Sequence, residues 1–252
     1  MKPKDYLPFV RHRLYPYCRD VFFAAYPVEP VAADFYLSLG PDCRTATHLN
    51  RNKLRICASP LDWMMCYTLK HAAELFQNGF STFFADVEEL PDSGTNNRIV
   101  KDRRNGMISI HHFPFSLTLE EGQKAYREKA ARHFSNTHRF MTEADRFAMV
   151  SHSTESIDDI CRFIGEIRKL YTAEIIFINV RNGKDKKREV FKPANNATLH
   201  EYIFEDVSPK EKRGIPGNWI MGDKYEWCRI LGKCRRTNKF SPPEKLVRES
   251  YN

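Results

Sequence analysis

The chain has 252 residues, of which 42% are hydrophobic and 13% aromatic, so it holds enough apolar surface to offset the entropy of folding and is not disordered. This length allows one large domain or two small ones with a sizeable core. The formal charge is +8, but residues 208–252 carry eleven Lys or Arg against five Asp or Glu, a balance of +6. The surplus lies near the end of the chain without an RNA-recognition, zinc-finger or zipper motif, so nucleic acid is not an expected partner.

The cysteines and the hydropathy pattern predict a cytoplasmic protein. Seven cysteines, an odd number without paired spacing, are typical of a chain whose thiols stay reduced. No apolar run approaches the roughly 20 residues that cross a bilayer. The charged opening, which includes Arg11 and Arg13, holds no apolar region of the signal-peptide kind. We therefore expect no membrane span.

The first 60 residues predict an arm and then the opening of an α/β unit. Residues 1–30, rich in aromatic residues and proline, are expected to form a partly helical arm that packs on the main body. Residues 32–39 favour a strand that stops at Gly40 and Pro41, and residues 43–54 favour a helix. A second short strand is predicted over residues 55–59.

The middle of the chain predicts two helices and a long loop. Apolar periodicity predicts a helix over residues 68–77, and the Pro, Gly and Asn content of residues 86–106 predicts a loop. Residues 107–113 favour a strand ended by Pro114, and residues 119–134 a polar helix.

The last third alternates more regularly between strand and helix. Strands are predicted over 146–150, 174–180 and 199–207, a helix over 156–171, and an exposed loop over 181–192. This alternation indicates the α/β class, with three α/β/α layers around a mostly parallel sheet. We expect a single α/β domain over residues 31–232, followed by a basic tail over 233–252.

Cys43 is the first candidate for chemistry. It follows Gly40, Pro41 and Asp42 at the predicted turn from strand to helix, where helix N–H groups would lower the pKa of a thiol and could bind an oxyanion. The alternative is a small buried residue, which describes most free cysteines.

Several residues could act as the base or the orienting acid beside Cys43. His111 and His112 end a predicted strand and should point to opposite faces. His152 ends the strand over 146–150, where α/β proteins often place functional groups, although it could equally bond the start of the next helix. Asp62 could orient a histidine, as the acid of a catalytic triad does, or cap a helix.

No metal site and no cofactor are predicted. The chain has no Cys-x-x-Cys, no His-Glu-x-x-His and no glycine-rich phosphate loop.

Three segments carry a resemblance to a known family. They are Ser38–Cys43, Ser59–Trp63 and Ile110–Phe113, and the closing Asn218-Trp219, Gly222-Asp223 and Trp227 add to them. Together they resemble a bacterial family of unknown function labelled "putative papain-like cysteine peptidase". This resemblance implies Cys43 as nucleophile, His111 as base and Asp62 as orienting acid, and it offers a papain-like α+β fold as the alternative architecture. Leu61 replaces the family's usual Phe, and His112 stands where an acidic residue is common.

Two functions follow from these features. The first is a thiol-dependent hydrolase for a peptide or another amide. The second is a non-peptidase α/β domain that binds or modifies a sugar, nucleotide or other anionic ligand at the Gly40–Cys43 turn, with Arg51 and Arg55 nearby. The expected binding residues are Gly40, Asp42, Arg44, Trp63, His112 and His152. The identity of the substrate and the oligomeric state stay open.

Overall fold

A computed structural model describes residues 27–91, 94, 96–208, 210–211, 214–215, 217 and 219–240. Nearly all of the N-terminal arm predicted over residues 1–30, and the end of the tail predicted over 233–252, lie outside the described residues.

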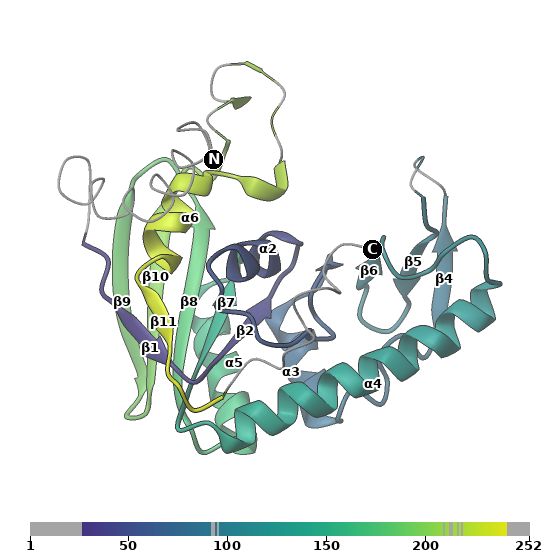
Figure 1. The fold of residues 1–252 in the computed structure, drawn as a ribbon, viewed down its shortest axis with the longest axis horizontal. Helices are drawn as coiled ribbons and strands as arrows, with labels where there is room; N and C mark the ends of the chain where they lie inside the picture. The colour runs from purple at the N-terminus through teal and green to yellow at the C-terminus, as the bar shows by residue number, and fades with distance from the viewer. Residues whose placement is uncertain are drawn as a thin grey trace, which may run out of the picture.

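The largest sheet has five strands in the order β2-β7-β8-β10-β9 (Figure 1). Its strands are β2 (Phe35–Leu39), β7 (Arg146–Ser151), β8 (Glu174–Asn182), β10 (Ala197–Phe204) and β9 (Lys187–Ala194). The first four are parallel to one another, and β9 pairs antiparallel with β10 at the edge. Four of the five strands therefore end at the same edge of the sheet, where functional groups of α/β proteins gather.

Helices pack on both faces of this sheet. Alternate side chains of its strands enter two separate clusters of buried residues, because successive strand residues point to opposite faces. One cluster includes α3 (Leu69–Gln77), α4 (Leu119–Glu143) and α5 (Ile157–Leu170). The other includes α2 (Arg44–Arg51) and α6 (Lys224–Leu231). The helices α3, α4 and α5 begin at the capping residues Thr68, Thr118 and Ser156, whose side chains accept backbone N–H groups.

A second, antiparallel sheet takes two of its four strands from residues 86–106, the region predicted to be a loop. Its order is β3-β6-β5-β4, with β3 (Met64–Met65), β6 (Ile108–Ser109), β5 (Ile99–Asp102) and β4 (Val87–Leu90). The prediction of a loop over residues 86–106 was thus wrong for its two ends. The ion pair of Lys101 with Glu88 and the pairing of Leu90 with Ile99 join β4 to β5. Neither strand alternates strictly between apolar and polar residues, which is the pattern that predicts a strand from sequence.

Other local predictions differ from the structure at particular segments. Residues 55–59 form no strand, although Ile56 is buried. The predicted loop over 181–192 is largely the end of β8 and most of β9, which covers the edge of β10. β11 (Cys234–Arg236) lies inside the segment expected to be a tail and pairs in parallel with β1 (Val31–Ala33). The predicted helix over 119–134 continues to Glu143.

The fold is mixed α/β, as predicted, but its two larger sheets are mixed and antiparallel, and not one mostly parallel sheet. The largest sheet contains an antiparallel strand, and the second sheet is inserted between β2 and β7. Among the described residues, no helix has the length and apolar character that crossing a membrane requires.

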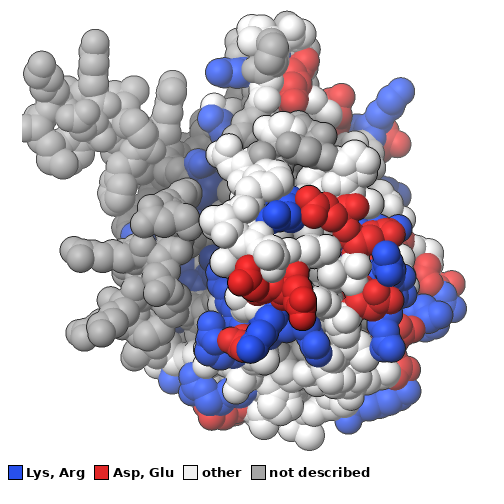
Figure 2. All heavy atoms as spheres, turned by 90° about the vertical axis from the view of Figure 1, so that its right-hand side faces the viewer, with Lys and Arg blue, Asp and Glu red and all other residues white. Residues whose placement is uncertain are grey.

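The surface over the second sheet and the start of α4 mixes both signs of charge. Figure 2 shows Lys and Arg side chains interleaved with Asp and Glu on this face. The pair Arg103–Asp86 is one example. No single-sign field that would attract a polyanion forms on this visible face.

Candidate functional site

Cys43 lies at the carboxyl edge of the main sheet, in the turn after β2. It is the residue that begins α2, with φ −71° and ψ −8°, and it is 0% exposed. Two bonds fix this turn: Ser151 Oγ donates to the carbonyl of Gly40 at 3.2 Å, and Thr47 Oγ1 donates to the carbonyl of Cys43 at 2.8 Å. The thiol is therefore held by its own helix and by the end of β7.

His111 reaches Cys43 from the other sheet. The pairing of Met64 with Ser109 joins β3 to β6 and places Trp63 and His111 just outside this pair. His111 Nε2 lies 3.7 Å from Cys43 Sγ. The ring of Trp63 stands edge-on to that of His111, with 6.2 Å between centroids. A thiol and an imidazole nitrogen at this separation are within reach of a proton transfer.

The pKa of the Cys43 thiol is raised to about 11, contrary to the prediction that the helix start would lower it. Burial is the largest cause, and the carboxylates of Asp42 and Asp62 add to it. The backbone N–H of Cys43 acts in the opposite direction, as expected for a helix start, but it is outweighed. Burial also lowers the pKa of His111. The resting pair at neutral pH is a thiol beside an uncharged imidazole.

Asp62 lies close enough to Cys43 to raise the pKa of the thiol, but its hydrogen-bond partners are Arg55 and Ser59 and not His111. Arg55 donates to Asp62 Oδ2 through Nε at 3.1 Å and through a terminal nitrogen at 2.5 Å, and the backbone N–H of Ser59 donates to the same oxygen at 2.8 Å. Within the described residues, no bond joins Asp62 to His111. Burial raises the pKa of Asp62, and the charge of Arg55 opposes that shift.

Trp63 and His112, two expected binding residues, have different surroundings. Trp63 is half-buried and has a φ of +67°, a left-handed conformation that side chains other than glycine seldom adopt. Such strain tends to accumulate at functional sites. The His112 ring stacks on Tyr126 with 4.5 Å between centroids, and its Nδ1 lies 2.9 Å from Ser109 Oγ. Burial lowers the pKa of His112 to about 3, so this ring stays uncharged.

A second cluster gathers the other expected residues around one buried carboxylate. Asp206 Oδ2 bonds Arg44, lies 3.4 Å from His152 Nε2 and accepts the indole N–H of Trp227 at 3.1 Å. His152 Nδ1 lies 3.1 Å from Asp42 Oδ2. Asp42 and Arg44 flank Cys43 in the chain, and His152 joins them in space. These three side chains bond to one another, to Asp206 and to the carbonyl of Trp219.

Asp206 follows β10 and was not among the residues that the sequence singled out. Its contacts come from α2, the end of β7 and α6, each far away along the chain, so no local spacing marks it. The common signal is position alone, since Cys43, His152 and Asp206 all follow carboxyl ends of parallel strands.

The arginines expected to attract an anionic ligand are already largely engaged. Arg44 pairs with Asp206, and Arg55 pairs with Asp62. Arg51 is exposed, with one terminal nitrogen 3.8 Å from Met221 Sδ. Two of the three charges are therefore neutralised inside the protein.

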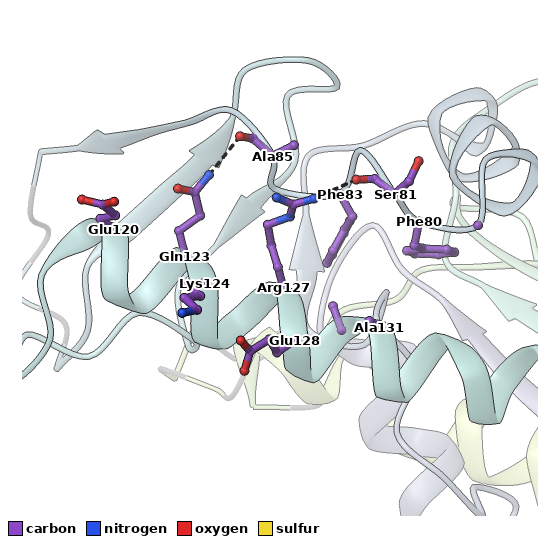
Figure 3. Close-up of a pocket in the computed structure, with 12 residues that line it drawn as sticks. Phe80, Ser81, Phe83, Ala85, Glu120, Gln123, Lys124, Arg127, Glu128 and Ala131 are labelled. Carbon is purple, nitrogen blue, oxygen red and sulfur yellow. Dashed lines mark hydrogen bonds between the residues drawn. The ribbon is translucent and has the colours of Figure 1, made fainter.

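A hollow of about 560 Å³ lies elsewhere, between α4 and the loop after α3 (Figure 3). Arg127 donates to the carbonyl of Ser81 at 2.9 Å, and Gln123 donates to that of Ala85 at 3.0 Å. Acidic and basic side chains both line the rim, namely Glu120, Lys124, Arg127 and Glu128. None of the candidate site residues lines this hollow. Among the described side chains, no group of three or more His, Cys, Asp or Glu is arranged to hold a metal ion.

The comparison with known families concerns the site around Cys43 and His111. Residues 34–134 match the family model described as "Putative papain-like cysteine peptidase (DUF1796)". This match confirms the resemblance over residues 34–134 and does not reach the closing segment at 218–227. The matched span contains Cys43, Asp62 and His111 but ends before His152 and Asp206. No curated protein and no solved structure gives a significant match to the chain.

Proposed function

We propose that this protein is a thiol-dependent hydrolase of the papain-like type, in which Cys43 is the nucleophile and His111 the general base. The observation that carries the proposal is the 3.7 Å separation between Cys43 Sγ and His111 Nε2. The two residues lie in turns that follow β2 and β6, strands of two different sheets. The family match over residues 34–134 supports it, because it includes both residues.

The first step is transfer of the thiol proton to His111 as the sulfur attacks a carbonyl carbon. The high pKa of Cys43 means that this transfer accompanies attack and is not complete beforehand. The backbone N–H groups at the start of α2 stabilise the oxyanion. The imidazolium then donates its proton to the leaving group, which leaves a thioester on Cys43. Water, deprotonated by His111, hydrolyses the thioester.

Asp62 takes part through its charge and through the turn that it holds. Its bonds to Arg55 and to Ser59 N–H fix the Pro60–Trp63 turn, and Trp63 in turn packs against His111. In this proposal Asp62 is a positioning residue.

Acylation by p-nitrophenyl acetate tests the proposal. The wild type should acquire one acetyl group on Cys43, located by mass spectrometry after acid quench, and release p-nitrophenolate in a burst. Cys43→Ala should abolish this adduct, and His111→Ala should slow its formation. An adduct rate at Cys43 that does not depend on His111 would contradict the proposal.

The ligand-binding domain is the competing proposal. Its distinguishing result is a Cys43→Ala variant that keeps full affinity for an anionic ligand such as a nucleotide. The pairing of Arg44 and Arg55 with carboxylates gives this alternative less support.

A further inference from the structure

The Tyr67 hydroxyl is a buried polar group without a hydrogen-bond partner among the described residues. The side chain is 6% exposed. Native proteins leave few buried polar atoms unpaired, and those that remain need an explanation. Tyr67 lies just after β3, so it belongs to the same short segment as Trp63.

This hydroxyl lies against the turn that carries Cys43. A Cβ atom placed on Gly40 would be 3.1 Å from Tyr67 Oη and 2.7 Å from the backbone nitrogen of Asp42. Gly40 therefore leaves a small space at the turn, bordered by a hydroxyl and an amide nitrogen. The carbonyl of Met64 closes the other side at 3.1 Å. Any side chain at position 40 would crowd the amide and push the turn away from Tyr67.

The surroundings of the Tyr67 hydroxyl keep it protonated, so it can donate a hydrogen bond. Burial raises the pKa of Tyr67, and the nearby carboxylates of Asp62, Asp42 and Glu155 raise it further. Two of these carboxylates, Asp42 and Asp62, are the ones that act on the Cys43 thiol. Tyr67 and Cys43 thus share one electrostatic environment, and the phenol holds its proton throughout the working pH range.

We propose that Tyr67 donates its O–H to the oxyanion that forms when Cys43 attacks a carbonyl. This inference rests on the proposed hydrolase function and adds a catalytic donor to it. The Cys43 sulfur bonds to the carbonyl carbon, and the carbonyl π electrons move onto oxygen. Tyr67 and the helix-start amides stabilise that oxygen until the electrons return and expel the leaving group. Cys43 and Tyr67 are both buried, so a carbonyl reaches Cys43 only after the side chains that cover it move.

Two reactions of Cys43 separate this role from a structural one. Acetylation by p-nitrophenyl acetate passes through an oxyanion, whereas alkylation by iodoacetamide displaces iodide and forms none. Tyr67→Phe removes only the unpaired oxygen, so we expect an intact fold, which circular dichroism and thermal unfolding check. Acetylation of Cys43 should fall about a hundredfold, the typical effect of losing one oxyanion donor. The alkylation rate should stay within a factor of about two.

Tyr126→Phe is the matched control. Tyr126 is also a buried tyrosine beside the site, but its hydroxyl is already bonded to Met64 Sδ at 3.5 Å. We expect this variant to keep both rates. Equal losses in acetylation and alkylation for Tyr67→Phe, or no loss in either, would overturn the assignment while leaving the hydrolase proposal intact. Absence of any acetyl adduct on wild-type Cys43 would instead overturn both.

Discussion

Two histidines lie beside the helix that Cys43 begins, and the structure treats them in opposite ways. Both nitrogens of His152 face fixed partners, with Asp42 on one side and Asp206 and Arg44 on the other. Within the described part of the chain, the hydrogen-bond partner of His111 is the Cys43 sulfur, and the His111 ring lies edge-on to the rings of Trp63 and His112. A histidine whose two ring nitrogens both have fixed hydrogen-bond partners stabilises the structure. A histidine with a ring nitrogen that has no fixed partner can accept or donate a proton.

The same contrast applies to charge. In the Asp206 cluster, Arg44 forms an ion pair with the carboxylate of Asp206, and His152 lies between the carboxylates of Asp42 and Asp206. Beside Cys43, the carboxylates disfavour the thiolate and the imidazole is uncharged. Under the proposed function, the first region supplies stability and the second supplies chemistry, because a reactive group needs an incompletely satisfied environment.

The largest expected effect separates the two histidines. His111→Ala should slow acetylation of Cys43 by roughly 100- to 10,000-fold, the range for loss of a general base, with little change in thermal stability. His152→Ala should do the reverse, because it removes a member of the Asp206 network and leaves the contact between Cys43 and His111 in place. Rapid-quench acetylation and thermal unfolding measure the two effects. Similar losses of activity in both variants would remove the distinction.

Asp206→Asn should cost about 3–5 kcal/mol of unfolding free energy, because it leaves Arg44 buried without its counter-charge. Urea unfolding measures this loss. Glu174→Gln is the control, since its partly exposed pair with Arg146 should be worth roughly 0–1 kcal/mol. A loss for Asp206→Asn no larger than that of the control would show that the cluster does not hold the domain together.

The pH dependence of alkylation tests the protonation state of Cys43. A thiol with a pKa of about 11 is protonated at neutral pH, so the iodoacetamide rate should rise about tenfold per pH unit from pH 7 to 10. At pH 7 the rate should be roughly a hundredfold or more below that of a thiol with the ordinary pKa of about 8.5. The exposed Cys66 is the internal comparison in the same mass-spectrometric experiment. Selective labelling of Cys43 at pH 6 would mean an activated thiolate and refute the neutral resting pair.

The smallest effect concerns Asp62. Asp62→Asn removes one of the charges that raise the Cys43 pKa and leaves Arg55 unopposed, so both changes lower that pKa. Alkylation at pH 8 should become several-fold faster. Asp159→Asn, on the exposed surface of α5, should leave the rate unchanged. A slower rate in Asp62→Asn would show that the turn at Pro60–Trp63 moves and that geometry outweighs charge.

Sequence patterns were most informative where periodicity was strong. The helix predicted over 156–171 and the strands over 146–150 and 174–180 agree closely with α5, β7 and β8. These segments are continuously apolar or strictly amphipathic, so their burial dictates their structure. The strands β4 and β5 were missed because they are short and do not alternate strictly: Glu88 and Glu89 are adjacent in β4, and Ile99 and Val100 are adjacent in β5.

The site was predictable in part. Position at a strand end indicated Cys43 and His152, and the family resemblance indicated His111. The neutral thiol was not predictable, because the helix-start argument considers only the local amides and not the carboxylate of Asp62 or the depth of burial. Asp206 and Tyr67 matter through contacts made across the fold, to which sequence spacing gives no guide.

The insertion of the second sheet between β2 and β7 has a consequence for folding. Within the main sheet β2 has one neighbour, β7, and Phe35 pairs with Phe147. The span from 34 to 134 contains both Cys43 and His111, yet it ends before the strand on which β2 and the Cys43 turn rest. A chain emerging from the ribosome would therefore complete the surroundings of these two residues only after β7 had been synthesised, and such long-range pairing slows folding. A fragment limited to the family-matched span should carry the thiol and the imidazole without the frame that brings them together.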